Sequence, residues 1–328
     1  MTSSAASSPR ADPVPGAAAG CPAQTGAVDI VREYPDTSWA GDGPTRAVER
    51  ELEDGHVLGF PKLAFVLSDA ERRFFDPRWA DGKAKNISLR WGGGPMRDPA
   101  RGPTHGEMRG AAGAPDELAD LKALITRYAE QSEALVQRLF PHYRGQLRRG
   151  NTSFRPVDVA GRATSWRQDD TRLHVDAFPS NPMQGTRLLR VFCNVNPAGR
   201  PREWRVGEPF EALATRYLPA IRRPLPGSAW LLQKTGLTKR RRTEYDHLML
   251  QLHDRAKGDA EFQRASPQAR AEFAPGTTWV VFSDQVLHAA MGGQHMLEQT
   301  FYLDVAHQQR PETAPRSTLE RLLGRELR

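Results

Sequence analysis

The sequence has 328 residues, of which 38% are hydrophobic, and it carries a formal net charge of +7. This length suits one large domain with extensions or two small ones, and the charge favours an anionic partner such as nucleic acid, a membrane surface or an acidic substrate, unless it is only a compositional bias toward Arg. Two cysteines, Cys21 and Cys193, exclude a disulfide framework and a Cys-based zinc site, and without an apolar run of about 18 residues no membrane-spanning helix is expected.

The N-terminal region combines a polar tail with helices and loops. Residues 1–28 are rich in Ser, Ala, Pro and Gly, and they predict a disordered tail because they hold too little apolar surface to offset the entropy of ordering. The tail lacks the apolar core of a secretory signal, so we expect a cytoplasmic protein. Over residues 29–150 we expect a short helix at 69–75, a mobile loop rich in Gly and Pro over 92–115, and one long helix.

The long helix has a clear sequence period. Pro115, Asp116 and Glu117 are residues that favour the first turn of a helix. Apolar residues then recur at spacings of three and four up to Phe140, and Pro141 ends the pattern. We therefore predict a helix that covers the core with its apolar side.

From Thr152 onward the pattern changes to short strand-like runs separated by turns that contain Pro and Gly. Many short strands without regular helix alternation predict an all-β barrel or sandwich core over residues 151–310, so that 29–310 forms one domain. A helical insertion is expected at about 240–274, and the C-terminal tail 311–328 can be helical. The expected strands are 153–159, 172–176, 187–195, 229–232, 277–283 and 300–305.

Three residues of the predicted β-core form a candidate metal site. His174 and Asp176 lie two apart on an expected strand, so both side chains point to one face. His288 follows the apolar run 279–282 and a short turn, and its separation from the pair would place it on a facing strand of a jelly roll. Two imidazoles and one carboxylate are the facial triad of non-haem Fe(II) oxygenases, which leaves positions open for a 2-oxo acid and O₂.

The triad has two alternatives. Zinc bound by the same ligands could catalyse hydrolysis. A buried histidine bonded to a neighbour, with no metal, is the simplest structural explanation. The remaining histidines of the C-terminal half suit surface or packing positions; they are His247, His253, His295 and His307.

A bound 2-oxo acid also needs a cation for its distal carboxylate. Many oxygenases of this class place an Arg about ten residues after the second His. Here the segment 289–300, which follows His288, contains no Arg or Lys. Arg190 is the alternative, because its strand resembles the Jumonji-type branch of these oxygenases, in which the basic residue lies about fifteen positions after the first His. A buried Arg also needs an anionic partner, which a structural carboxylate could supply as well. Asn194 shares its face by two-residue alternation, and the Thr171 hydroxyl could add a hydrogen bond. Arg187 lies on the opposite face, but a bulge would exchange the two arginines.

Segments 82–89, 152–156, 173–179, 189–197, 202–210 and 245–249 resemble the bacterial Kdo 3-hydroxylases (Kdo dioxygenases), and the resemblance covers roughly residues 30 to 310. It implies a mainly β protein with added helices around a double-stranded β-helix (jelly-roll, cupin-like) core. It also implies an oxygenase that uses Fe(II), 2-oxoglutarate and O₂. The implied reaction hydroxylates 3-deoxy-D-manno-oct-2-ulosonic acid (Kdo) at C3 in Kdo-lipid A of the lipopolysaccharide inner core, and gives D-glycero-D-talo-oct-2-ulosonic acid, succinate and CO₂.

The resemblance also implies a location and partners. Kdo-lipid A is made at the cytoplasmic face of the inner membrane, so the implied enzyme is cytoplasmic, contacts an anionic membrane surface peripherally and does not bind nucleic acid. The charge agrees, because Arg side chains suit carboxylates and phosphates and basic runs attract anionic lipid. The candidate substrate residues are Arg200, Arg202 and Arg205, with the run 239–242 as a further basic segment.

Two other functions remain open at this point. One is a Jumonji-like 2-oxoglutarate oxygenase of protein or nucleic acid, which salt-sensitive binding to nucleic acid would favour. The other is a non-enzymatic barrel that binds an anionic glycolipid, which a lack of Fe(II) and 2-oxoglutarate binding would favour.

Overall fold

The computed structural model describes residues 30–41, 48–91, 106–156 and 165–327. The predicted tail 1–28, most of the predicted loop 92–115 and the end of the predicted strand 153–159 lie outside these ranges.

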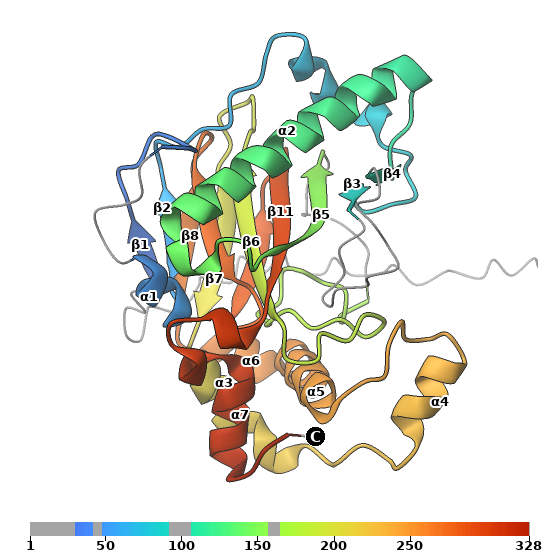
Figure 1. Cartoon of the computed structure of the whole chain (residues 1–328), viewed down its shortest axis with the longest axis vertical. Coiled ribbons are helices and arrows are strands. Elements are labelled where there is room, and N and C mark those ends of the chain that lie inside the picture. The colour runs from blue at the N-terminus through green and yellow to red at the C-terminus, as the bar shows by residue number, and fades with distance from the viewer. Residues whose placement is uncertain (1–29, 42–47, 92–105, 157–164, 328) are drawn as a thin grey trace, which may run out of the picture.

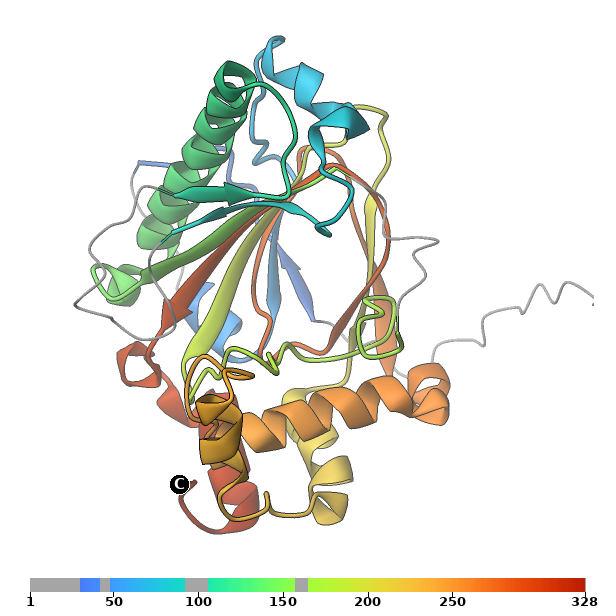
Figure 2. The ribbon, with the colours of Figure 1, turned by 90° about the vertical axis from the view of Figure 1, so that its right-hand side faces the viewer.

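Two β-sheets form the centre of the molecule (Figures 1 and 2). The pair β1–β2 of the larger sheet is parallel, and the other strand pairs of both sheets are antiparallel. The larger sheet has the order β1 (Val31–Glu33), β2 (Val57–Phe60), β9 (Thr278–Phe282), β6 (Arg187–Asn194), β11 (Met296–Leu303), β5 (Arg148–Arg155), β3 (Ile87–Arg90) and β4 (Glu107–Arg109). The smaller sheet has the order β10 (His288–Gly292), β7 (Arg202–Gly207) and β8 (Gln268–Phe273).

Helices cover one face of the larger sheet and one end of the molecule (Figure 1). The α-helices are α1 (Val48–Glu53), α2 (Pro115–Leu139), α3 (Phe210–Tyr217), α4 (Ser228–Lys234), α5 (Glu244–Gly258), α6 (Ala260–Ala265) and α7 (Pro315–Leu323). Short 3₁₀ turns occur at Glu71–Phe75, Pro77–Trp79, Pro141–Tyr143, Leu218–Ala220, Val305–His307 and Pro311–Thr313. No helix within the described ranges is long and apolar enough to cross a membrane.

The predicted long helix is confirmed as α2, which lies diagonally across the larger sheet (Figure 1). The Glu117 side chain accepts a hydrogen bond from the Ala114 backbone amide at 3.1 Å, which satisfies a backbone donor at the start of the helix. The buried residues Leu135, Val136 and Leu139 pack against the outer face of β6 and β11. Burial of this apolar stripe, more than helix propensity, holds α2 in place.

The two faces of β6 have different environments. Leu189 and Val191 point outward to the α2 layer, whereas Phe192 points inward and packs with Trp204 and Trp279 between the two sheets. Arg190 shares this inner face by alternation. The interior between the sheets is therefore apolar at one end and polar where Arg190 lies.

Three predicted elements differ from the structure. The predicted strand 229–232 is wrong, because this short apolar run forms the helix α4; periodicity does not distinguish a strand from a helix in so short a run, and Ala and Leu favour helix. The predicted strand 172–176 is reduced to a single bridge at His174. The predicted insertion 240–274 is helical only in part, since its last residues form β8 and pair with β7.

Candidate metal centre

The structure brings His174, Asp176 and His288 together. His174 and His288 exchange backbone hydrogen bonds of 3.0 and 2.9 Å, so they lie side by side, and the prediction of facing strands is wrong in this detail. The Asp176 amide donates to the Ser283 carbonyl at 2.8 Å, which holds the carboxylate on the same side. One candidate ligand atom from each residue lies within 4.8 Å of the others.

The hydrogen bonds of the two imidazoles determine which nitrogen faces the site. Nδ1 of His174 lies 2.7 Å from the Arg172 carbonyl, and Nδ1 of His288 lies 2.8 Å from the Val286 carbonyl. Because a carbonyl only accepts, each Nδ1 carries the proton, and each Nε2 keeps a lone pair for a metal. Burial lowers the pKa of both rings, and for His174 the neighbouring His288 lowers it further. Neutral imidazole is the form that binds metals.

Asp176 supplies the negative charge of the site. Burial alone would raise the pKa of its carboxyl, but the Arg190 guanidinium and the two histidines outweigh burial and hold the pKa well below the usual range. Nη2 of Arg190 lies 3.1 Å from Oδ2 of Asp176. The carboxylate therefore stays ionised, as an iron ligand requires.

The strand register of β6 distinguishes the two candidate arginines. Arg190 lies on the inner face beside the triad, where Nη1 is also 3.1 Å from Oε1 of Glu298. Arg187 is fully buried on the other face, where it stacks over the Phe282 ring at 3.9 Å and binds Asp284 at 2.8 Å. Of the two arginines, only Arg190 contacts a residue of the triad, Asp176.

Glu298 and Arg155 are neighbours of Arg190 that the sequence interpretation missed. Nε of Arg155 lies 3.0 Å from Oε2 of Glu298, so one carboxylate holds two guanidiniums on the inner face. The alternation of Met296, Glu298 and Thr300 along β11 was the available signal, because it places a charged residue on one face of a strand that is buried on both faces.

Two buried donors near the triad have no hydrogen-bond acceptor among the described residues: Nε of Arg190 and Nε1 of Trp204. The Trp204 ring stacks on His288, with ring centroids 5.0 Å apart and an interplanar angle of 23°. An unsatisfied buried donor costs about 1–3 kcal/mol. One donor belongs to a neighbour of Asp176 and the other to a neighbour of His288, so a bound molecule that carries acceptor oxygens would satisfy them.

The other predicted cofactor residues are engaged in local bonds. The Thr171 hydroxyl donates to Oδ1 of Asp169 at 2.7 Å. The Asn194 amide donates to the carbonyls of Arg200 and Phe273 at 3.0 and 2.9 Å. Both side chains therefore already have hydrogen-bond partners outside the triad.

The three predicted substrate arginines occupy different environments. Arg200 is exposed in the turn before β7, whereas Arg202 is buried and donates to the Gly293 carbonyl at 2.7 Å. Arg205 donates to the carbonyls of Thr171 and Gln263 at 2.7 and 3.2 Å, which ties β7 to the segment before the triad and to α6.

Side chains from distant segments complete the surroundings of His174. Lys85 forms an ion pair with Asp170, whose carbonyl accepts from the Ala290 amide at 2.8 Å. Burial opposes ionisation of Asp170, but Lys85, then Arg155 and His174, lower its pKa to about 2. The His253 ring of α5 packs edge-on against His174, with centroids 5.4 Å apart.

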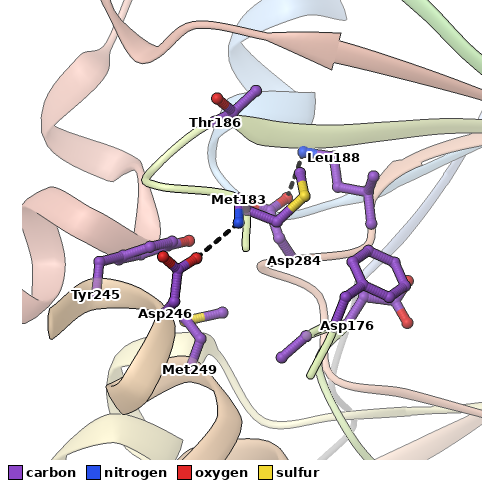
Figure 3. Close-up of a pocket in the computed structure, with 10 residues that line it drawn as sticks. Asp176, Met183, Thr186, Leu188, Tyr245, Asp246, Met249 and Asp284 are labelled. Carbon is purple, nitrogen blue, oxygen red and sulfur yellow. Dashed lines mark hydrogen bonds between the residues drawn. The ribbon is translucent and has the colours of Figure 1, made fainter. Parts of the chain in front are cut away.

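A small cavity adjoins Asp176 on the side of α5 (Figure 3). Its volume of about 10 Å³ leaves room for about one water molecule. Asp246 of α5 accepts hydrogen bonds from the Met183 and Gln184 amides at 2.7 and 2.9 Å, so the loop that follows Asp176 is tied to this helix (Figure 3).

The sheets and the triad define a class: non-haem metal oxygenases with a jelly-roll core and a facial triad of two histidines and one carboxylate. Residues 37–326 match the family model described as 3-deoxy-D-manno-oct-2-ulosonic acid (Kdo) hydroxylase. The chain belongs to this family. No match was found among curated proteins.

Solved structures of the Kdo hydroxylase KdoO, a non-haem Fe(II) α-ketoglutarate-dependent dioxygenase, are similar to the chain. The complex with α-ketoglutarate and Fe(III) has a TM-score of 0.82 at 45% identity, covering 90% of this chain and 97% of that one. The cobalt(II) complex has a TM-score of 0.84 at 46% identity, and the complex with succinate and Fe(III) has 0.83 at 44%. Each of the latter two covers 91% of this chain and 97% of the other. The predicted fold class, mainly β with added helices and a jelly-roll core, is confirmed.

Proposed function

We propose that this protein hydroxylates Kdo at C3 in Kdo-lipid A, with Fe(II), 2-oxoglutarate and O₂, and that it forms D-glycero-D-talo-oct-2-ulosonic acid, succinate and CO₂. The observation that carries the proposal is the buried triad of His174, Asp176 and His288 in a chain of the Kdo hydroxylase family. Fe(II) held there supplies the oxidative chemistry that attacks an unactivated C–H bond. Family membership does not favour the two alternatives, a Jumonji-like oxygenase or a binding barrel.

The residues of this chain have separate roles in the proposal. The Nδ1–H bonds of both histidines hold the rings in the metal-binding orientation. Arg190 keeps Asp176 ionised and meets the distal carboxylate of 2-oxoglutarate through its unsatisfied Nε, while Trp204 offers a second donor. Thr171 and Asn194 stay predictions as cofactor residues, and their existing bonds give them less support.

The acceptor sugar carries a carboxylate that needs a cation near the triad. Arg200, Arg202 and Arg205 stay predictions for contacts with the sugar or with lipid phosphates. Lys85 has more geometric support, because its partner Asp170 accepts a backbone hydrogen bond from Ala290, two residues after His288. We propose that the enzyme acts at the cytoplasmic face of the inner membrane. There it contacts anionic lipid peripherally and has no nucleic-acid partner.

Turnover with defined acceptors tests the function. Anaerobic addition of Fe(II) and 2-oxoglutarate should produce a weak visible charge-transfer band. After O₂ is admitted, Kdo-lipid A should gain one oxygen by mass spectrometry, located at C3 by NMR. Lipid A without Kdo is the matched control and should stay unchanged. Oxygen gained on that control, or 2-oxoglutarate consumed only with a peptide or nucleic acid, would contradict the proposal.

Two lysine substitutions test whether Lys85 contacts the acceptor sugar. Lys85→Ala should raise the KM for Kdo-lipid A by about tenfold, since a hydrogen bond to a charged group contributes about 1.5–3 kcal/mol, and it should leave the KM for 2-oxoglutarate unchanged. Lys83→Ala is the matched control, because Lys83 is exposed in the same segment. Equal effects of the two substitutions on the acceptor KM would remove Lys85 from the site.

A further inference from the structure

The segment Arg222–Arg242, here called the α4 arm, exposes an unusual number of large apolar side chains. Four of the five exposed large hydrophobic residues in the described ranges belong to it: Leu225, Trp230, Leu231 and Leu237, with exposed fractions between 56% and 79%. Single exposed apolar residues need no explanation, but a group within one short segment indicates a contact surface. Figure 1 shows α4 projecting from the body of the molecule, away from both sheets.

The charge of the α4 arm has one sign. The arm contains seven Lys and Arg residues and no Asp or Glu. Arg222, Arg223, Lys234, Lys239 and Arg241 are exposed. A second copy of this surface would meet like charges, which disfavours self-association through the arm. Nucleic acid would account for the cations but not for exposed leucines.

Exposed Trp and Leu beside Lys and Arg are typical of a segment that lies in a membrane interface. The apolar side chains enter the boundary between headgroups and acyl chains, and each nearby cation adds about 1 kcal/mol on anionic lipid. Trp230 is suited to this boundary because its ring is apolar and its N–H is polar.

Hydrogen bonds hold the base of the α4 arm on the loop that follows Asp176. The Lys239 amide donates to the Ser180 carbonyl at 2.9 Å, and Arg242 donates to the Pro179 carbonyl at 2.8 Å. Gln184 donates to the Arg241 carbonyl at 2.8 Å. At the other end of the arm, His247 of α5 donates to the Arg222 carbonyl at 2.9 Å. The arm is therefore fixed relative to the triad.

We propose that the α4 arm docks the enzyme on an anionic lipid bilayer. Trp230, Leu231, Leu225 and Leu237 enter the interface, the exposed cations contact lipid phosphates, and the loop after Asp176 faces the membrane that holds the acceptor. The inference rests on the proposed function for the identity of that membrane, but the binding itself does not require turnover.

Vesicle sedimentation of the full chain tests the docking. The probes are phosphatidylcholine vesicles with and without phosphatidylglycerol, and the protein should bind the anionic vesicles at least tenfold more tightly. The variant W230S/L231S should lose at least tenfold of that binding. Val66→Ser is the matched control, because Val66 is the fifth exposed hydrophobic residue and lies outside the arm. Circular dichroism and thermal melting verify that all variants fold.

The outcomes separate the docking from the catalytic proposal. Vesicle binding that W230S/L231S lowers and V66S does not supports the docking even if no Kdo is hydroxylated. In an active enzyme, W230S/L231S should lose turnover on vesicle-embedded Kdo-lipid A selectively, relative to a water-soluble Kdo saccharide. Unchanged binding by W230S/L231S, no binding by the unmodified chain, or a concentration-dependent dimer that this variant abolishes would overturn the proposal.

Discussion

Replacing His174 by Ala should lower Fe(II)-dependent turnover by more than about 100-fold, because loss of a direct ligand should exceed the 10–100-fold typical of losing an outer partner of a ligand. The imidazole is buried, its Nδ1–H is bound to a carbonyl, and its Nε2 faces Asp176 at 3.8 Å. Iron content after dialysis and 2-oxoglutarate consumption measure the effect.

The control is His307→Ala, a histidine in a 3₁₀ turn outside the triad. It should keep its iron and its activity. Thermal melting should show that both variants fold. If His174→Ala retains iron and turnover, then this residue is not a metal ligand and the triad is wrong.

The second large effect is expected at Arg190. Arg190→Ala should raise the KM for 2-oxoglutarate by about 100-fold or more, since loss of one partner of a buried ion pair costs about 3–5 kcal/mol. Arg190→Lys should restore part of this loss, because it keeps the charge but not the planar fork. The Kd from titration of the anaerobic charge-transfer band reports 2-oxoglutarate binding separately from turnover.

The same substitution should change the pH dependence of iron binding. Arg190 lowers the pKa of Asp176, so its removal raises that pKa toward the value favoured by burial. A protonated carboxyl does not bind iron, so Arg190→Ala should release iron at a higher pH than the unmodified protein as the pH falls. Iron retained by dialysis across a pH series measures the shift.

Arg187→Ala tests whether 2-oxoglutarate binding depends on the position of Arg190 and not on any buried arginine of β6. It leaves Asp284 buried without its cation, so the free energy of unfolding should fall by about 3–5 kcal/mol. The fraction that stays folded should keep the KM for 2-oxoglutarate. If Arg187→Ala alone raises this KM, the anchor is Arg187 and the role given to Arg190 is wrong.

Elements with a strong local pattern could be predicted from the sequence. The helix α2 has start signals, an unbroken apolar stripe and a terminating proline, and β6, β9 and β11 are rich in apolar residues. The strands β7 and β8 lack such an apolar pattern, because half of their twelve residues are exposed or only partly buried. These strands form because β7 pairs with β8 and with β10. Such pairing between distant segments cannot be predicted from the local sequence.

The residues of the candidate site could also be predicted only in part. His174, Asp176 and His288 were predicted from residue type and spacing, and Arg190 from a resemblance to the Jumonji-type position of the basic residue. Glu298 and Arg155 were missed, because they reach Arg190 only where β6, β11 and β5 lie side by side. Lys85 was left without a role because its ion pair with Asp170 joins segments 85 residues apart.

The sequence by itself determined the chemistry available to this protein: two imidazoles and one carboxylate, a set of side chains that fits a non-haem iron site because ligand type sets metal preference. Only the tertiary structure decided how that site is assembled. Backbone pairing sets His174 beside His288, and strand register turns Arg190 inward and Arg187 outward. Both depend on hydrogen bonds between segments far apart in the chain, and such bonds leave no trace in the spacing of residues along it.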